Sequence, residues 1–150
     1  MKKKSIRDIR AFGRFYTDII GLLNQHLLDS PYSLAEARLI YEIHTGKTIQ
    51  PSQIMEIMHI DKSYLSRLLK KLERENVITK KQSGEDARAV LLSLTAKGLR
   101  EFEALNKASD EQIGQLVQPL ADEQAEQLVL HMKAIMTILK TTNKTPENDQ

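Results

Sequence analysis

The spacing of apolar residues along the chain predicts a mainly helical protein. From residue 6 to residue 28, apolar side chains recur every three or four positions, which is the period of one face of an α-helix. The same period predicts five further helices over about 34–46, 51–59, 62–75, 96–117 and 122–139. The chain has only 6 Gly and 4 Pro, which also favours helices over a fold of strands and turns.

Several polar residues lie where helices are expected to begin and end. Ser33, with Glu36 three residues later, has the pattern of a capping box. Asp61 is a favourable N-cap for the helix after it, and Pro51 suits the first turn of a helix. Asn76 can adopt the left-handed conformation that ends a helix. These signals place a short helix, a tight turn and a longer helix in succession.

Two β-rich runs follow this pair of helices. Residues 77–81 and 89–94 have the composition and alternation of strands, and the polar segment 83–88 between them is typical of a turn. The chain is therefore expected to form a β-hairpin directly after the longer helix. Residues 47–50 are expected to be a short link between helices.

Composition narrows the classes of protein to which the chain can belong. Its 150 residues suit one domain, or one domain with a dimerisation extension, and 41% hydrophobic residues are enough to bury a core. The absence of Cys excludes disulfides, thiolate metal sites and thiol redox sensing, and fits a reducing cytoplasm. No apolar run reaches the roughly 18 residues that cross a bilayer, and no signal peptide is evident. We therefore expect a cytoplasmic protein with no membrane association.

The small net charge hides an uneven distribution. Residues 1–46 carry 7 basic and 5 acidic side chains, a balance of +2. Residues 47–100 carry 11 and 6, a balance of +5, and residues 101–150 carry 4 and 9, a balance of −5, so that the total is +2. A basic middle segment indicates a localised anion-binding surface, although chance clustering on solvated faces gives the same counts.

The helix predicted over 62–75 has two contrasting faces. At 100° per residue, four leucines fall within an arc of about 100°. Basic and hydroxyl side chains occupy an arc of about 60° on the opposite side, with no acidic residue among them: they are Ser63, Arg67, Lys70 and Arg74, flanked by Ser66 and Lys71. A helix–turn–helix whose second helix is basic on its outer face suits the major groove of DNA. The alternative is an ordinary solvated surface helix.

The predicted hairpin adds a second candidate contact with DNA. Arg88 lies at the tip, where a guanidinium can enter the narrow minor groove, and Lys80 lies on the first strand. Asp86, two residues before Arg88, is expected to stabilise the turn or hold the guanidinium. A hairpin directly after a recognition helix is the wing of a winged helix, whereas an isolated hairpin of this kind would be only a charged turn.

This order of elements, with two sequence stretches, resembles the MarR family of bacterial transcriptional regulators. The stretches are SLAEARLIYEI and DKSYLSRLLKKLERENVITKKQSGEDARAVLLSLTAKG. The resemblance implies a mainly α, winged helix–turn–helix fold with one β-hairpin wing, flanked by N- and C-terminal dimerisation helices. It further implies one MarR-like domain over 1–140, with the winged helix at about 33–95, dimerisation helices at about 6–28 and 96–139, and a flexible tail at 141–150.

The resemblance also implies partners and contact residues. Family members are homodimers that bind pseudo-palindromic operators in double-stranded DNA, usually as repressors. Carried over by position, the major-groove and phosphate contacts are Lys62, Ser63, Tyr64, Ser66, Arg67, Lys70 and Lys71. Ser52 and Gln53 correspond to phosphate contacts at a helix N-terminus, and Arg88 corresponds to the minor-groove residue.

An effector pocket is a further expectation from the resemblance. It would be lined by Phe12, Phe15 and Tyr16 from the first helix, by Tyr41 and His44 from the second, and by the fifth helix. The same residues would equally serve as core or dimer packing. No cofactor and no metal site is expected, because the four histidines are far apart in sequence and have no Cys partners.

The sequence and the resemblance leave three candidate functions for this chain. The first is a dimeric, ligand-responsive DNA-binding repressor. The second is a winged-helix module whose basic face binds an acidic protein. The third is a regulatory partner of a separate acetyltransferase, since the segment RFYTDIIGLLNQHLLDSPYSLAEARLIYEI most resembles family members fused to such a domain. Residues 1–150 contain no acetyltransferase motif, so acetyl transfer is not expected of them, and nothing else in the motifs indicates an enzyme.

Overall fold

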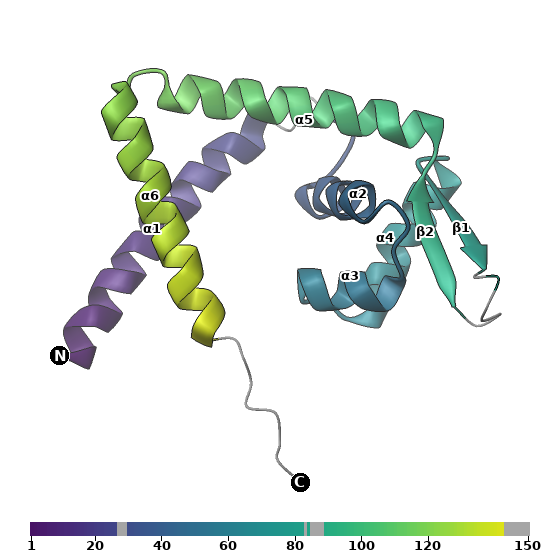
Figure 1. Ribbon diagram of the computed structural model, residues 1–150, viewed down its shortest axis with the longest axis horizontal. Helices are drawn as coiled ribbons and strands as arrows, with labels where there is room; N and C mark the ends of the chain where they lie inside the picture. The colour runs from purple at the N-terminus through teal and green to yellow at the C-terminus, as the bar shows by residue number, and fades with distance from the viewer. Residues whose placement is uncertain (27–29, 83, 85–88, 143–150) are drawn as a thin grey trace, which may run out of the picture. The chain divides into compact units, whose positions relative to one another are not determined.

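The described residues of a computed structural model form six helices and one two-stranded hairpin (Figure 1). The structure describes residues 1–26, 30–82, 84 and 89–142. Its elements are α1 (Lys2–His26), α2 (Leu34–Gly46), α3 (Pro51–Met58), α4 (Lys62–Arg74), β1 (Ile78–Gln82), β2 (Val90–Leu94), α5 (Ala96–Val117) and α6 (Asp122–Thr142). The chain divides into two units, Met1–Asp110 and Glu111–Gln150. The mainly α fold with a single hairpin is the predicted one.

Two helix boundaries differ from the prediction. Helix α1 begins at Lys2, four residues before the first apolar position, because lysines are good helix formers even where they contribute nothing to an apolar face. Helix α6 continues into the segment predicted to be a flexible tail. The hydroxyls of Thr141 and Thr142 donate hydrogen bonds to the carbonyls of Ile138 and Leu139, at 2.6 and 2.8 Å. Residues 143–150 lie outside the described residues.

The predicted capping signals are confirmed in the winged helix. The Ser33 hydroxyl accepts from the Glu36 amide at 3.2 Å, and the Glu36 carboxylate accepts from the Ser33 amide at 3.1 Å. The Asp61 carboxylate accepts from the Tyr64 amide at 2.7 Å at the start of α4. Asn76, with φ 60°, adopts the left-handed conformation after α4.

The hairpin is joined by a third segment that the pattern of the sequence does not predict. Strands β1 and β2 pair antiparallel, with Ile78 opposite Leu94 and Gln82 opposite Val90. Ile49, in the link between α2 and α3, forms a bridge with Leu92 on β2. The Ile49 amide donates to the Leu92 carbonyl at 3.1 Å, and the Leu92 amide donates to the Ile49 carbonyl at 2.8 Å. This bridge attaches the hairpin to the helix–turn–helix.

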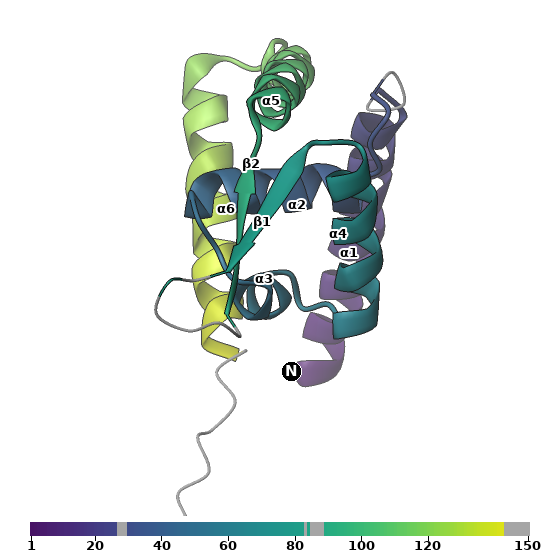
Figure 2. The same ribbon diagram turned by 90° about the vertical axis from the view of Figure 1, so that its right-hand side faces the viewer.

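The core of the described chain lies within the winged helix. Its fully buried side chains come from α2, α3, α4 and the hairpin: Leu39, Ile40, Ile43, Ile54, Leu65, Leu72, Val77 and Leu92. Figure 2 shows these three helices and the hairpin gathered around that core. In contrast, no described residue of α6 is buried. None of the described helices is sufficiently long and apolar to cross a membrane.

Thr95 joins the hairpin to the start of α5. Its hydroxyl donates to the Asn76 carbonyl at 2.5 Å and accepts from the Gly98 amide at 2.9 Å, so that it caps α5. Its own amide donates to the Val77 carbonyl at 3.0 Å. The beginning of α5 is therefore held closely against the end of α4 and the beginning of β1.

Candidate nucleic-acid interface

Helix α4 has the two faces that its sequence predicts. Leu65, Leu68, Leu69 and Leu72 are all buried, with at most 8% of their surface exposed. The side chains of the opposite arc are exposed: Ser63, Arg67, Lys70 and Arg74. Packing of the leucines fixes the rotation of α4 and so directs this basic arc outward. None of the ion pairs among the described residues involves Arg67, Lys70 or Arg74.

Helix α3 and a tight turn precede α4, as expected for a helix–turn–helix. His59, with φ 54°, ends α3 in the left-handed conformation, and its amide donates to the Met55 carbonyl. Ser52 and Gln53 are exposed in the first turn of α3. The side-chain oxygen of Gln53 accepts from the Gln50 amide at 2.9 Å. Gln53 therefore stabilises this helix end with its oxygen, and its NH₂ group is the part left for an external acceptor.

Tyr64 supports the central arginine of α4. The Arg67 guanidinium carbon lies 5.6 Å from the centre of the half-buried Tyr64 ring, within the range of a cation–π contact. The spacing of three residues on one helix allows this contact, which the sequence analysis did not predict. Lys62 is exposed in the first turn of α4, and Ser66 is half-buried at the side of the basic arc.

Lys71, which the resemblance assigns to DNA contact, forms an ion pair within the protein. Its ammonium lies 2.7 Å from a carboxylate oxygen of Glu36 on α2. The Glu36 side chain is only 8% exposed, whereas that of Lys71 is 37% exposed. The hydrogen bond to Glu36 raises the pKa of Lys71 above its ordinary value. The helical wheel, which places Lys71 at the edge of the basic arc, gives no sign of this internal partner.

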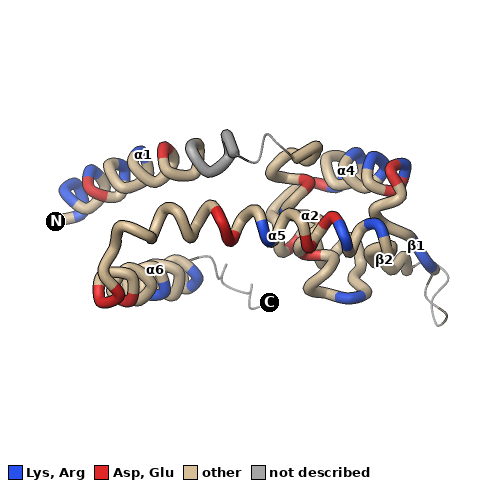
Figure 3. The backbone as a smooth tube through the Cα atoms, turned by 90° about the horizontal axis from the view of Figure 1, so that it is seen from above, with Lys and Arg blue, Asp and Glu red and all other residues tan. Residues whose placement is uncertain are grey.

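The wing continues the basic surface beyond the end of α4. Lys80 and Lys81 are exposed on β1, and Lys80 lies 3.0 Å from Glu73, an exposed pair of the kind that contributes little to stability. Figure 3 marks the Lys and Arg positions that succeed one another along α4 and β1. Asp86 and Arg88 lie outside the described residues, so their predicted roles at the hairpin tip remain predictions.

A cavity of about 250 Å³ opens between α2 and α5. Its lining comes from both helices: Leu34, Ala37, Arg38, Tyr41, Phe102, Leu105, Asn106 and Ser109. Tyr41 is one of the predicted lining residues. His44 stands beside the cavity, with its ring stacked 3.8 Å from that of Phe102. Phe102 was missed because its role depends on packing between two helices far apart in sequence.

The other predicted pocket residues are placed differently. Phe12, Phe15 and Tyr16 on α1 do not line the cavity, and all three are exposed in the described chain. Phe12 and Tyr16 stack on each other with ring centres 5.6 Å apart, as their spacing of four residues along a helix allows. The cavity thus lies between the second and fifth helices, which were both expected to line the effector pocket, whereas no residue of α1 lines it.

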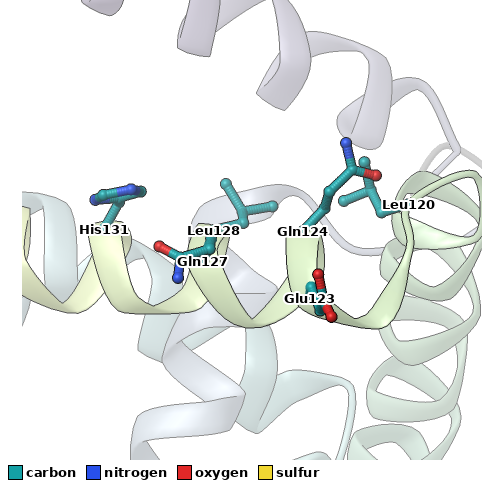
Figure 4. A pocket seen from close by; sticks show the side chains of 6 residues that line it. All are labelled: Leu120, Glu123, Gln124, Gln127, Leu128 and His131. Carbon is teal, nitrogen blue, oxygen red and sulfur yellow. The ribbon is translucent and has the colours of Figure 1, made fainter.

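Helix α6 carries a shallow apolar depression (Figure 4). Gln124, Leu128 and His131 point to the same side of the helix, and Leu120, Glu123 and Gln127 complete the lining. Further along α6, large apolar side chains are also exposed: Val129, Leu130, Met132, Ile135, Met136, Ile138 and Leu139. An apolar surface of this extent is typical of a protein–protein contact. Among the described residues, no three acidic or histidine side chains cluster as a metal site would require.

Comparison with known proteins gives the same family as the sequence motifs. The model of the MarR family matches residues 32–90, which hold the described winged helix up to the start of β2. The organic hydroperoxide resistance transcriptional regulator of Bacillus subtilis is 32% identical over 98 residues, covering 65% of this chain and 63% of that protein. The matched region thus spans less than two thirds of that relative. The transcriptional regulator BilQ of Clostridium symbiosum is 28% identical over 111 residues, covering 73% and 72%.

Solved structures agree on the fold. A crystal structure of an E. coli MarR mutant superposes with a TM-score of 0.75 at 20% identity, covering 85% of this chain and 94% of the other. The same mutant complexed with operator DNA superposes with a TM-score of 0.71 at 21% identity, covering 85% and 95%. At this level of identity, the likeness establishes the winged-helix fold.

Proposed function

Since residues 32–90 of this chain match the model of the MarR family, we propose that it is a transcriptional regulator that binds double-stranded DNA with sequence preference. In this proposal, two copies bind a pseudo-palindromic operator, and helix α4 of each copy enters the major groove of one half-site. Binding occludes a promoter, so that the protein acts as a repressor.

The observation that carries the proposal is the exposed basic arc of α4. Arg67, Lys70 and Arg74 project from a helix whose opposite side is anchored by buried leucines, and no carboxylate among the described residues is paired with them. A fixed helix with free cationic side chains suits both phosphate contacts and the edges of bases. The relative solved with operator DNA has the same fold.

Replacing Arg67 with alanine should weaken operator binding by about 1–3 kcal/mol and relax the preference at one base pair of each half-site. The physical reason is that an exposed guanidinium, oriented by Tyr64, can donate two hydrogen bonds to the edge of a guanine. The measurement is the affinity for a panel of single-base variants of a duplex that the wild-type protein selects from a random pool.

Arg100→Ala on α5 is the matched control, because it removes the same charge from another exposed position. It should leave base preference unchanged. Neither variant should lower the melting temperature appreciably, since both side chains are exposed. If Arg67→Ala lowered the affinity equally for every single-base variant of the duplex, this residue would contact phosphate only. If the wild-type protein retained no duplex but bound an acidic protein, a protein-interaction module would replace the proposed function.

We also propose that a small apolar effector binds in the cavity between α2 and α5 and releases the protein from DNA. The cavity has aromatic walls from Tyr41 and Phe102 and a volume of about 250 Å³, which suits a small planar molecule. Ala37→Trp should fill it with an indole ring. The variant should keep operator affinity within about twofold but lose the response to any planar aromatic compound that releases the wild-type protein.

Ala96→Trp, at an exposed position outside the cavity, is the control and should retain the response. A response that persists in Ala37→Trp would place effector binding elsewhere. A thiol trigger is excluded in any case, because the chain contains no cysteine.

A further inference from the structure

We infer that Lys71 is a positioning residue, which holds helix α4 against α2 through Glu36 and does not contact the DNA backbone. The inference rests on the proposed function, since it concerns how the recognition helix is set for DNA. It assigns a distinct role to one of two neighbouring lysines, Lys70 and Lys71, that the sequence presents as equivalent.

The two oxygens of the Glu36 carboxylate have different partners. One accepts from the Ser33 amide at 3.1 Å and closes the capping box of α2. The other accepts from the Lys71 ammonium at 2.7 Å, across 35 residues of sequence. Because the capping box fixes the carboxylate at the start of α2, its bond to Lys71 fixes a point in the last turn of α4 to the same place.

Burial and charge make this contact more than an ordinary surface pair. The Glu36 side chain is almost completely buried. Removing its cationic partner would therefore leave a buried carboxylate oxygen without a full set of hydrogen-bond donors from the protein or from water. Negative charge is concentrated here. Burial and the carboxylates of Glu101, Glu75 and Glu36, in that order, raise the pKa of the nearby Tyr32 to about 12. Lys71 supplies compensating positive charge to this acidic surrounding.

The pair also lies beside the residues proposed to contact DNA. Lys71 is one helical turn from Arg67 and adjoins Lys70, so a shift of α4 at Lys71 moves both side chains. Recognition of base edges tolerates only a small displacement of the groups that donate hydrogen bonds. Glu36 further belongs to the helix that supplies Leu34, Ala37 and Tyr41 to the cavity wall. A movement of α2 would therefore also displace α4 through the Glu36–Lys71 pair.

The experiment compares four variants by operator affinity as a function of salt concentration, using the duplex selected by the wild-type protein. Lys70→Met should weaken binding and lower the magnitude of the slope of log K against log salt by about 1 for each phosphate that the variant no longer neutralises. Lys71→Met should weaken binding about tenfold at each salt concentration while the slope stays at the wild-type value. Lys71→Arg, which keeps the ion pair, should restore most of the affinity.

Glu36→Gln separates positioning from charge. It removes a negative charge from a DNA-binding protein, so electrostatics alone would tighten binding. If the ion pair positions α4, this variant weakens binding with an unchanged slope. The inference is overturned if Lys71→Met lowers the slope as Lys70→Met does, or if Glu36→Gln binds as tightly as wild type or more tightly. A wild-type protein that retains no duplex would overturn the proposed function, and this inference with it.

Discussion

Replacing Gly98 with alanine should destabilise the winged helix by about 3 kcal/mol or more, although alanine is the better helix former. A Cβ atom at this position would lie 2.0 Å from the carbonyl oxygen of Val77 and 3.0 Å from its carbonyl carbon. Both atoms belong to the backbone, so no flexible side chain can move aside. The same carbonyl accepts the Thr95 amide, so relieving the clash would disturb the junction between hairpin and α5. Urea unfolding followed by circular dichroism measures the loss.

Gly114→Ala is the matched control for this change, because it makes the same substitution in the same helix. A Cβ atom there meets nothing within 4 Å among the described residues, so only helix propensity changes. This variant should be more stable than wild type by about 0.5–1 kcal/mol. Equal effects of the two substitutions would contradict the close approach of α5 to Val77.

The helices of the winged domain were predictable because their signals are local. Ser33 and Asp61 cap helices with bonds to residues three positions away, and the leucine stripe of α4 needs only the helical period to be recognised. The left-handed residue Asn76 after α4 was predictable for the same reason, since it depends on the intrinsic conformation of one residue type. Local rules thus account for most of the fold and for the outward basic arc.

Contacts between distant segments account for what the sequence analysis missed. Ile49 looks like part of a linker because its partner Leu92 lies in another element, and only the folded chain brings their backbones together. The ion pair of Lys71 is invisible in the pattern of α4, because its partner Glu36 is 35 residues away. Phe102 enters the cavity only because α5 packs beside α2. Single-helix patterns contain none of this information.

Ile135→Glu on α6 should convert a dimer into a monomer and weaken operator binding by about 10²–10⁴-fold. Helix α6 buries no described residue, yet Met132, Ile135 and Leu139 form one apolar stripe along it. We expect this stripe to be covered by a second copy, where a glutamate would be desolvated without a partner. Loss of the second copy would leave one half-site contact in place of two linked ones. Sedimentation equilibrium at micromolar concentration measures the state of association, alongside affinity for the selected duplex.

Thr137→Glu tests whether the effect depends on the face of the helix and not on the added charge. Thr137 is exposed on the side of α6 away from the stripe, and the substitution introduces the same side chain two residues from Ile135. It should remain a dimer and bind the operator nearly as wild type does.

A wild-type protein that sediments as a monomer would contradict the two-half-site mechanism. A dimeric Ile135→Glu variant would instead place the dimer contact away from this stripe. Because no described residue of α6 is buried, neither substitution should remove the helical signal of the winged domain, so a loss of DNA binding would report association and not unfolding.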